Sequence, residues 1–325
     1  MRAAVVTRYG SPDIVQIRDV EKPVPKDNEV LIRVRAASVN PLDLTWMSGT
    51  PYFARLTGGL GTPKDTRLGA DVAGQVEAVG KSITRFKPGD EVFGLSRGSL
   101  AEYVCALDTD SFFSALAIKP AGVTFEQAAA VPVAGLTALQ GLRKGGIKPG
   151  SKVLINGAAG GVGTFAVQIA KSFGSEVTGV CSTRNAEMLR SLGADRAIDY
   201  TREDFTRGGQ RYDILLDCVG NHSLSESRRV LNPGGRYVGV GAEHGRWMSP
   251  VDRMIHALVV SWFAKDVVPL MAKGNGDDLA ALGHLIESGK ITPAIEKCYR
   301  LSDAAAALRH LAGGHARGKI VITVD

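Results

Sequence analysis

The sequence lacks the residues that would build a zinc site in its first part. No histidine precedes His222, and the four cysteines of the 325-residue chain include no CxxC pair. Zinc sites are built from clustered Cys, His and carboxylate ligands, so we expect no metal. Two of the cysteines lie inside apolar runs typical of small buried side chains. Because the four are far apart and no spacing favours disulfides, we expect a reducing, cytoplasmic protein. They are Cys105, Cys181, Cys218 and Cys298.

Long apolar runs and runs of one charge are also missing. The longest apolar stretch covers residues 257–264, far shorter than a membrane-spanning helix, and the first eight residues lack the apolar core of a signal peptide. The net charge is +6, but no run of five basic residues occurs, so no nucleic-acid partner is expected. With 44% hydrophobic and 22% charged residues, the chain has an ordinary globular composition and enough length for two domains.

The pattern of the chain changes near residue 120. Before this point, residues 29–36 and 71–80 alternate polar and apolar side chains, as half-buried strands do. Residues 124–143 are Ala-rich with a helical period that Pro132 interrupts. We therefore expect a β-rich first domain and a second domain of a different kind.

After residue 150, strand-like and helical segments alternate. Predicted strands cover residues 152–155, 176–181, 196–198, 214–218 and 237–240, and predicted helices cover residues 162–173, 186–192 and 223–231. This alternation is typical of βαβ units, which form a parallel sheet covered by helices on both faces. Helices at 279–287 and 302–311 and a strand at 319–324 follow. That last strand has no partner left in the parallel sheet, so we expect it to return to the first domain.

A glycine-rich turn between the first of these strands and the first helix is the strongest functional signal. It places Gly157, Gly160 and Gly163 in a GxxGxxG spacing. Glycines let a backbone approach a pyrophosphate closely, and the start of a helix supplies free N–H groups and a positive dipole end. The spacing alone is a weak signal, but the strand before it and the helix after it predict a dinucleotide site. The expected cofactor contacts are Gly157, Ala158, Gly160, Gly161, Val162 and Gly163.

The end of the second strand indicates which dinucleotide binds. NAD sites usually place Asp or Glu there to bind the adenosine ribose hydroxyls. This chain has Ser182, Thr183 and Arg184 instead, and its next acid is Glu187. Hydroxyls and a guanidinium suit the 2′-phosphate of NADPH, and Tyr200, at the end of the next strand, is expected to add a contact. The alternative interpretation makes Arg184 an ordinary surface arginine.

Several motifs along the whole chain occur in the order of a known family. They are ASVNPLD (37–43), GADVAG (69–74), GDEVFG (89–94), AEYV (101–104), the glycine turn (157–163), LGAD (192–195) and RGKIV (317–321). With them the sequence resembles the zinc-independent quinone oxidoreductase (zeta-crystallin-like) branch of the medium-chain dehydrogenase/reductase superfamily, close to the subgroup of the reticulon-interacting reductase.

The resemblance implies an α/β fold with two domains. A GroES-like β-rich catalytic domain would occupy residues 1–120 and be completed by residues 290–325. A Rossmann NADPH-binding domain, a doubly wound parallel sheet, would occupy residues 121–289. The same resemblance implies a homodimer.

The resemblance also assigns further residues to the cofactor and explains the missing metal. Zinc-dependent relatives carry Cys where this chain has Asn40, and Gly-His-Glu where it has residues 69–71. Both differences imply an enzyme without zinc. The residues assigned to the cofactor are Thr137, Val219, Gly220 and Gly241 near its nicotinamide half, and Lys319 in the terminal motif.

Asn40, Asp43 and Tyr52 are the candidate catalytic residues. Hydride transfer builds negative charge on the acceptor, usually on oxygen, and the site must stabilise it. Zinc would polarise a simple carbonyl. Without zinc, hydrogen-bond donors must act on acceptors that delocalise charge themselves, such as quinones and α,β-unsaturated carbonyls. We expect Asn40 and Tyr52 to be these donors and Asp43 to orient their loop. The alternatives are a turn-capping asparagine and an interface tyrosine.

Three functions remain open from the sequence. The first is an NADPH-dependent reductase of small quinones or enones. The second is an enoyl-thioester reductase of the same superfamily, and the third is a non-catalytic, structural or regulatory NADPH-binding protein. A complete nucleotide loop and the polar candidate residues favour catalysis. The apolar and aromatic segment at 247–263 is expected to be core or dimer interface, or else a substrate lid.

Overall fold

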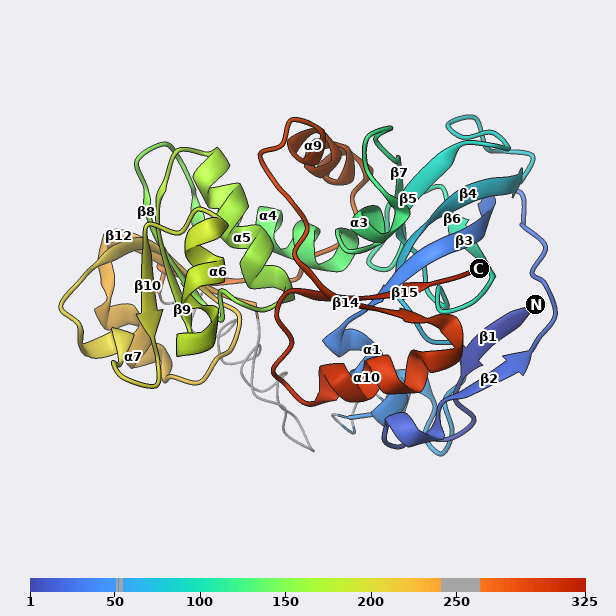
Figure 1. Ribbon diagram of the computed structural model, residues 1–325, viewed down its shortest axis with the longest axis horizontal. Coiled ribbons are helices and arrows are strands. Elements are labelled where there is room, and N and C mark those ends of the chain that lie inside the picture. Colours follow the sequence, from blue (N-terminus) through green and yellow to red (C-terminus); the bar gives the residue numbers. More distant parts are fainter. Residues whose placement is uncertain (51, 53–54, 241–263) are drawn as a thin grey trace. The chain divides into compact units, whose positions relative to one another are not determined.

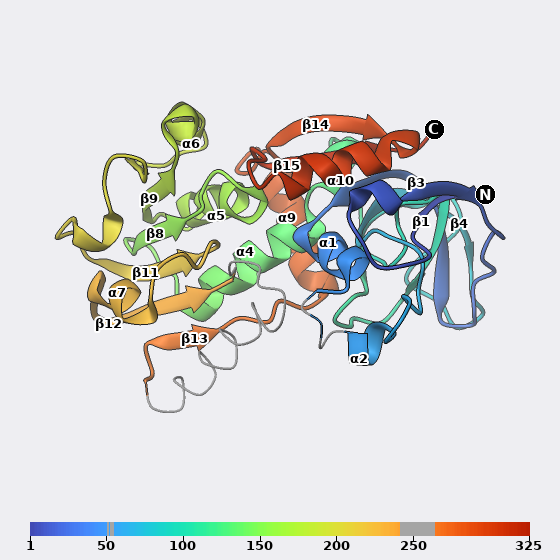
Figure 2. The same cartoon turned by 90° about the horizontal axis from the view of Figure 1, so that it is seen from below.

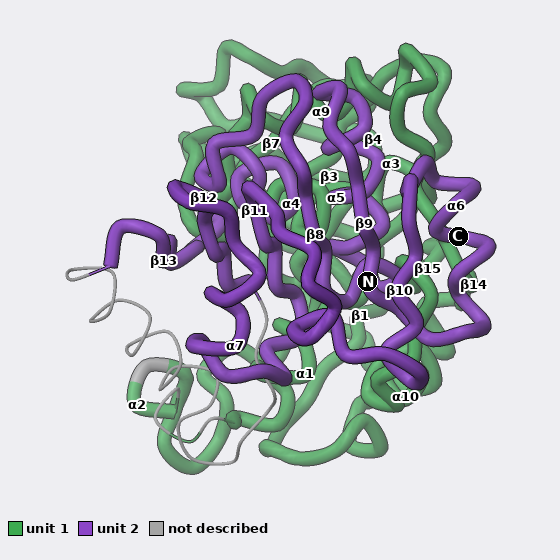
Figure 3. The backbone as a smooth tube through the Cα atoms, turned by 90° about the vertical axis from the view of Figure 1, so that its left-hand side faces the viewer, with its two compact units in different colours: residues 1–136, 273–325 green, residues 137–272 purple. Residues whose placement is uncertain are grey.

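The computed structural model describes residues 1–50, 52, 55–240 and 264–325 (Figure 1). The chain divides into two compact units (Figure 3). The first consists of Met1–Leu136 and Lys273–Asp325, and the second of Thr137–Ala272. Two expectations lie outside the described residues, namely the cofactor role of Gly241 and the role of the segment 247–263.

The first unit is built on a seven-stranded sheet. Its strands run in the order β14, β15, β3, β4, β5 and β7, and β6 pairs with β3 beside this path. All described pairs in it are antiparallel except that of β14 with β15. The strands are β3 (Glu29–Val39), β4 (Asp71–Val79), β5 (Glu91–Leu95), β6 (Tyr103–Leu107), β7 (Ala115–Ile118), β14 (Ile295–Arg300) and β15 (Lys319–Thr323). A separate two-stranded sheet pairs β1 (Arg2–Val5) with β2 (Gln16–Asp19).

The helices of the first unit come from two separate parts of the chain. They are α1 (Pro41–Ser48), α2 (Arg55–Gly58), α3 (Phe125–Ala129), α9 (Gly276–Glu287) and α10 (Ala304–Ala312). Helix α3 packs against β3 and β4, and α9 packs against β7. Both helices contact the sheet of the first unit, and the compact units divide after residue 136 and before residue 273. The domain boundaries near residues 120 and 290 stay a prediction.

The C-terminal strand returns to the first unit, which confirms the expectation. β15 lies antiparallel to β3, with Val321 opposite Ser38 and Ile322 opposite Ala37. Helix α10 packs against β14 and β15 (Figure 1). The strand β14 was not expected, because its mostly exposed side chains lack the apolar alternation that marks a half-buried strand.

The second unit is the parallel sheet that the sequence predicts. Its strands run in the order β10, β9, β8, β11, β12 and β13, all parallel. They are β8 (Lys152–Asn156), β9 (Glu176–Cys181), β10 (Arg196–Asp199), β11 (Tyr212–Asp217), β12 (Leu231–Gly239) and β13 (Val267–Pro269). The helices are α5 (Gly161–Ser172), α6 (Ala186–Ser191), α7 (Leu224–Arg229) and α4 (Pro132–Gly145), which starts in the first unit. Figure 1 shows α4, α5 and α6 on one side of the sheet and α7 on the other, and Figure 2 gives the view from below. The doubly wound Rossmann fold is confirmed.

One strand of this sheet begins earlier than expected. The sequence predicts a helix to residue 231 and a strand from 237, but α7 ends at Arg229 and β12 starts at Leu231. Leu231 pairs with Tyr212, and after a register shift Arg236 pairs with Ile214. Pro233 and the two glycines after it lie between the predicted helix and the predicted strand, whereas the irregular pairing with β11 includes them in β12. Within the described ranges, no helix is both long and apolar enough to cross a membrane.

Candidate active site

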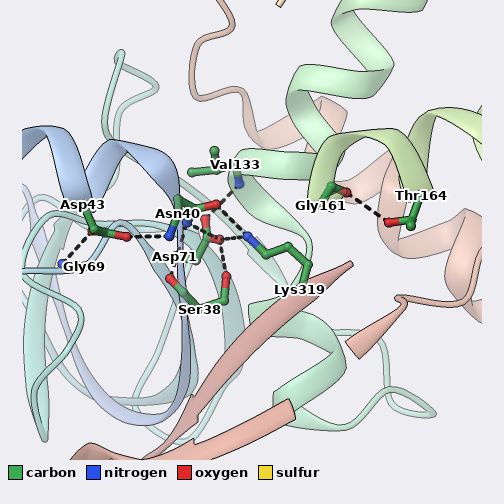
Figure 4. Close-up of polar contacts among 9 residues, drawn as sticks. All are labelled: Ser38, Asn40, Asp43, Gly69, Asp71, Val133, Gly161, Thr164 and Lys319. Carbon is green, nitrogen blue, oxygen red and sulfur yellow. Dashed lines mark hydrogen bonds and ion pairs between the residues drawn. The ribbon is translucent and has the colours of Figure 1, made fainter. Parts of the chain in front are cut away.

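Asp43 joins the start of α1 to the loop before β4. Its carboxylate accepts a hydrogen bond from the backbone N–H of Asn40 at 2.7 Å and one from that of Gly69 at 3.0 Å (Figure 4). Gly69 has a φ of +104°, and a Cβ there would lie 2.5 Å from the backbone nitrogen of Leu100. Only glycine therefore lets the two segments approach this closely.

Asp71 is the centre of a second set of polar contacts. It begins β4 opposite Ser38 of β3, and the Ser38 hydroxyl donates to its Oδ2. The Asn40 amide donates to the same oxygen at 2.9 Å, and the backbone N–H of Val133 donates to Oδ1 at 2.8 Å. The Asp71 side chain is fully buried, so these donors replace the water that a buried carboxylate loses.

Lys319 brings the only positive charge that the described contacts give to this cluster. Its ammonium donates to Asn40 Oδ1 at 2.6 Å and to Asp71 Oδ2 at 3.2 Å, and its side chain is 3% exposed. A lysine ammonium has three N–H donors, so one of them has no acceptor among the described residues. Figure 4 shows the side chain reaching from β15 toward Asn40 and Asp71.

Burial changes the acidity of Asp43. Loss of solvent raises the pKa of its carboxyl to about 7, and the charge of Asp71 acts in the same direction. The N–H groups of Asn40 and Gly69 and the charge of Lys319 oppose this rise. Asp43 therefore takes up a proton near neutral pH, unlike an exposed aspartate.

The contacts of Asn40 differ from the expectation that it donates to the acceptor. Its side-chain amide already donates to Asp71 and, at 3.3 Å, to the carbonyl of Ser38, while its oxygen accepts from Lys319. An amide has two N–H donors, so both are engaged inside the protein. Sequence reasoning missed Ser38, Asp71 and Lys319 as a group, although polar residues in otherwise apolar strand segments were an available signal.

Tyr52 lies beside a stacked arginine. The Arg55 guanidinium lies 4.7 Å from the ring centre of Tyr52 and 4.3 Å from that of Tyr9. Arg55 also donates to the carbonyls of Gly49, at 2.9 Å, and Ser48, at 3.1 Å. These contacts tie Tyr52 to the end of α1, in the same unit as Asn40 and Asp43.

The glycine turn of the second unit has the geometry of a pyrophosphate loop. Gly157 has a φ of +79°, and a Cβ on Gly163 would lie 2.3 Å from the carbonyl oxygen of Gly157. Gly160 is the N-cap of α5, and because glycine has no side chain, the cap supplies no acceptor to the first N–H groups of the helix. Gly161 and Val162 open the helix, and Ala158 is fully buried beneath it. This loop fits a dinucleotide phosphate.

Asp217 shapes the loop that carries Val219 and Gly220. Its Oδ1 accepts from the backbone N–H groups of Val219 at 3.1 Å and Gly220 at 2.8 Å. The Asn156 amide donates to the same oxygen at 2.8 Å, and the Tyr237 hydroxyl donates to Oδ2 at 3.0 Å. Asp217 is buried, and sequence reasoning missed it because its partners come from three different strand ends.

The residues expected at the 2′-phosphate follow two neighbouring strands, and Asp199 lies beside them. Ser182 and Arg184 follow β9, and Tyr200, 57% exposed, follows β10. The Thr183 hydroxyl, however, donates to the carboxylate of Asp199 at the end of β10. The structure therefore brings an acid to a place where the sequence of β9 alone shows none. The remaining expected contacts are Thr137, half-buried in α4, and Lys319, which lies in the cluster of the first unit.

Comparisons with known proteins agree with this architecture. The family described as alcohol dehydrogenase GroES-like domain matches residues 26–141, and the one described as zinc-binding dehydrogenase matches residues 192–322. The mitochondrial NAD(P)H oxidoreductase RTN4IP1 of Mus musculus is 33% identical over all of this chain and 89% of its own length. This chain belongs to the medium-chain dehydrogenase/reductase superfamily. The resemblance read from the motifs is confirmed.

Two further members of the superfamily are similar over nearly the whole chain. The 2-methylene-furan-3-one reductase of Solanum lycopersicum is 35% identical over 99% of this chain and 79% of its own. The solved structure of the quinone oxidoreductase from Coxiella burnetii has 32% identity and a TM-score of 0.87, covering 100% of this chain and 99% of its own. The superfamily consists of nicotinamide-dependent oxidoreductases, and this chain is one of them.

The same relatives correct the expected location. RTN4IP1 of mouse, cattle and human is named mitochondrial in each case. The expectation of a cytoplasmic protein is therefore wrong. Widely spaced reduced cysteines, on which it was based, do not distinguish the cytoplasm from other reducing compartments.

Metal ligands are scarce at the positions that zinc-dependent members use. Asn40 and Ala70 stand where those members have Cys and His, and neither side chain supplies a usual zinc ligand. In the part of the chain that the structure describes, no three His, Cys, Asp or Glu side chains are grouped to hold a metal ion.

Proposed function

We propose that this protein reduces quinones and α,β-unsaturated carbonyls with NADPH and without zinc. The contact of the buried Lys319 ammonium with Asn40 and Asp71 carries the proposal. In zinc-dependent members these two positions hold the Cys and the Glu of the metal-site motifs. Here the Lys319 ammonium, a cation of the protein itself, pairs with the buried carboxylate of Asp71. The Coxiella quinone oxidoreductase and the NADPH-dependent alkenal/one oxidoreductase of Arabidopsis thaliana support this function by their names.

The donors of the first unit define the acceptor class. We assign Lys319 and Tyr52 to the developing negative charge, with Asn40 and Asp71 as the residues that position Lys319. Asp43 holds Asn40 in place through its backbone N–H. A positive charge and hydrogen bonds stabilise a delocalised anion such as a quinol anion or an enolate, whereas an isolated carbonyl would need the stronger polarisation of a metal.

The residues of the second unit fit NADPH. NADPH supplies a hydride from its nicotinamide ring when bound. The start of α5 would hold its pyrophosphate, and Asp217 would keep the Val219–Gly220 loop in the shape that receives the nicotinamide half. The amide of Asn185 donates to the Ser182 hydroxyl at 3.2 Å, which leaves the hydroxyl hydrogen free to point at a 2′-phosphate. Arg184 would add a charge-assisted contact. The Escherichia coli quinone oxidoreductase, 26% identical with a TM-score of 0.81, was solved in complex with NADPH.

A turnover assay tests the proposal. Purified protein should oxidise NADPH in the presence of 1,2-naphthoquinone and of an open-chain enone, and treatment with a chelator should leave both rates unchanged. A simple ketone should be a poor acceptor. Lack of turnover with quinones and enones alike, in a protein that binds NADPH, would favour the non-catalytic alternative.

An enoyl-thioester reductase is the second candidate. The solved structure of CurK enoyl reductase is similar, with 27% identity and a TM-score of 0.83 over all of this chain. A crotonyl thioester serves as the discriminating substrate. The quinone and enone proposal fails if kcat/KM for this thioester exceeds that for every quinone and enone tested.

We also propose that the protein is a homodimer that pairs through the edge of the Rossmann sheet. β13 is the edge strand beside β12, and an edge strand offers unpaired N–H and C=O groups to a second copy. Light scattering during size-exclusion chromatography should give twice the 34.3 kDa mass of the chain.

A further inference from the structure

The carboxyl ends of β9 and β10 lie side by side at one end of the strands of the Rossmann sheet, and this end is called the edge below. Cys181, the last residue of β9, pairs with Asp199, the last residue of β10. The segments that follow, 182–184 and 200–201, therefore start side by side. In a Rossmann sheet the end of the second strand receives the adenosine ribose, so a group at the end of the third strand can also reach the ribose 2′ position.

Asp199 holds the hydroxyl groups at this edge. It accepts from the Thr183 hydroxyl through Oδ2, and through Oδ1 it accepts the Thr201 hydroxyl at 2.7 Å and the Thr201 N–H at 3.0 Å. The hydrogen bonds from Thr183 and Thr201 keep the pKa of this carboxyl below its usual value. Asp199 is therefore a carboxylate at neutral pH.

The hydroxyls of Thr183 and Ser182, both expected at the 2′-phosphate, thus differ in whether their hydrogen is available to a ligand. A hydroxyl has a single hydrogen to donate. That of Thr183 is taken by Asp199, whereas Ser182 accepts from Asn185 and keeps its hydrogen available. A phosphate facing this edge would meet one donor hydroxyl and one carboxylate.

We infer that Asp199 is a specificity-determining residue that opposes the 2′-phosphate and accepts a hydrogen bond from a free ribose 2′-hydroxyl. The inference rests on the proposed use of a nicotinamide cofactor. Asp199 does from the third strand what the acid of an NAD site does from the second. Arg184 and Ser182 favour NADPH while Asp199 favours NADH, so the preference for NADPH is narrow. The negative charges of Asp199 and of a 2′-phosphate would repel each other at short distance even at an exposed site, and salt weakens this repulsion.

Binding of adenosine fragments isolates the site from the rest of the cofactor. Calorimetry compares 2′,5′-ADP, which carries the 2′-phosphate, with 5′-AMP, which carries the free hydroxyl. Asp199→Asn should tighten 2′,5′-ADP by about tenfold, as expected for removal of a nearby like charge, and should weaken 5′-AMP several-fold. The gain for 2′,5′-ADP should shrink as salt rises, since the screening length falls from about 10 Å at 0.1 M to about 3 Å at 1 M.

Two further variants separate the charge from the hydroxyl and from general effects. Thr183→Val keeps the shape of the side chain and should leave 2′,5′-ADP affinity within about twofold, because the lost hydrogen was donated to Asp199. Glu176→Gln removes the same charge from the first residue of β9, at the opposite edge of the sheet. It should leave both affinities unchanged.

Two outcomes would overturn the inference. One is an Asp199→Asn variant that weakens both fragments equally, which would make Asp199 a purely structural residue. The other is a Thr183→Val variant that loses about tenfold in 2′,5′-ADP affinity, which would make Thr183 a phosphate donor. Both outcomes leave the proposed function intact if NADPH binds and turns over. A wild-type protein that binds neither NADPH nor NADH would instead contradict the proposed function itself.

Discussion

Three charged side chains lie buried within one polar cluster of the first unit. Asp43 and Asp71 are fully buried, and the Lys319 side chain is 3% exposed. Two acids against one base leave a negative excess when all three are charged. Removing one partner from such a group leaves an uncompensated charge without water, which is far more costly than the loss of an exposed ion pair.

Replacing Lys319 should reveal this cost. Lys319→Met is expected to lower the free energy of unfolding by about 3–5 kcal/mol, the range for breaking a buried ion pair. Urea unfolding measures it. Adding Asp71→Asn to this variant should cost less than it does in the wild type, because the carboxylate has already lost its cation.

An exposed lysine nearby provides the control. Lys297→Met, on the mostly exposed strand β14, should change stability by no more than about 0.5 kcal/mol. Equal losses in both lysine variants, or additive losses for Lys319 and Asp71, would contradict the buried ion pair.

The raised pKa of Asp43 predicts a specific dependence of stability on pH. In the unfolded chain an aspartate titrates near 3.9, and in the folded protein Asp43 titrates at about 7. Between these values the folded state keeps a proton that the unfolded state releases, so this group's contribution to stability falls as pH rises. Relative to Asp43→Asn, the wild type should lose up to about 4 kcal/mol between pH 4 and pH 7.

The comparison removes the effect of all other titrating groups. Carboxylates with lowered pKa, such as Glu102 and Asp195, act in the opposite direction but are present in both proteins. Urea unfolding at several pH values gives the difference. A difference between wild type and variant that stays constant from pH 4 to pH 8 would show that Asp43 does not titrate in this range.

At the scale of the element, the turn into α5 combines two kinds of glycine. Gly163 has no room for a side chain, since a Cβ would lie 2.6 Å from Ala158 Cα. Gly160 has room, because the nearest atom to its Cβ is the Gly157 oxygen at 3.5 Å. Gly163 is therefore required by the fold, whereas Gly160 is not, and under the proposed function Gly160 would be needed for the pyrophosphate that approaches the helix start.

Alanine at each position should separate these roles. Gly163→Ala is expected to cost about 1–3 kcal/mol of stability, as overpacking does, and to weaken NADPH as well. Gly160→Ala should cost only about 0.5–1 kcal/mol at an N-cap but should weaken NADPH by at least about tenfold. Thermal unfolding and calorimetric titration measure the two effects. Full NADPH affinity in Gly160→Ala would mean that the pyrophosphate does not approach the backbone there.

At the scale of the whole molecule, the chain returns to its first unit at its end. Ile322 of β15 is fully buried in a core that also contains Ala4 and Val39. Leu215 of β11 is fully buried in a different core, that of the second unit. Each unit thus has an apolar core of its own, and the core of the first unit joins both ends of the sequence.

Hydrogen exchange should report this division. Ile322→Ala is expected to cost about 2–5 kcal/mol and to lower amide protection in β3 and β4, far away along the sequence. Leu215→Ala, the matching variant in the core of the second unit, should lower amide protection in β8 and β9 instead. Equal loss of protection in both units for either variant would show that they unfold together.

Features that depend on short stretches of sequence were determined by the sequence alone. The parallel sheet followed from alternating strand and helix periods, and the nucleotide loop from glycines between a strand and a helix. The absence of Cys and His at the zinc-ligand positions can also be read from short motifs. These features need no knowledge of distant residues, because backbone conformation and residue type decide them.

Only the tertiary structure decided which polar groups meet. Lys319 and Asn40 are 279 residues apart, and no periodicity links them before β15 pairs with β3. Asp199 reaches Thr183 across 16 residues because β10 lies beside β9, although the end of β9 contains no acid of its own. Asn40 looked like a free donor until Asp71 and Ser38 were brought to it. A hydrogen bond depends on a few tenths of an ångström between atoms, and strand pairing, not residue type, sets those distances.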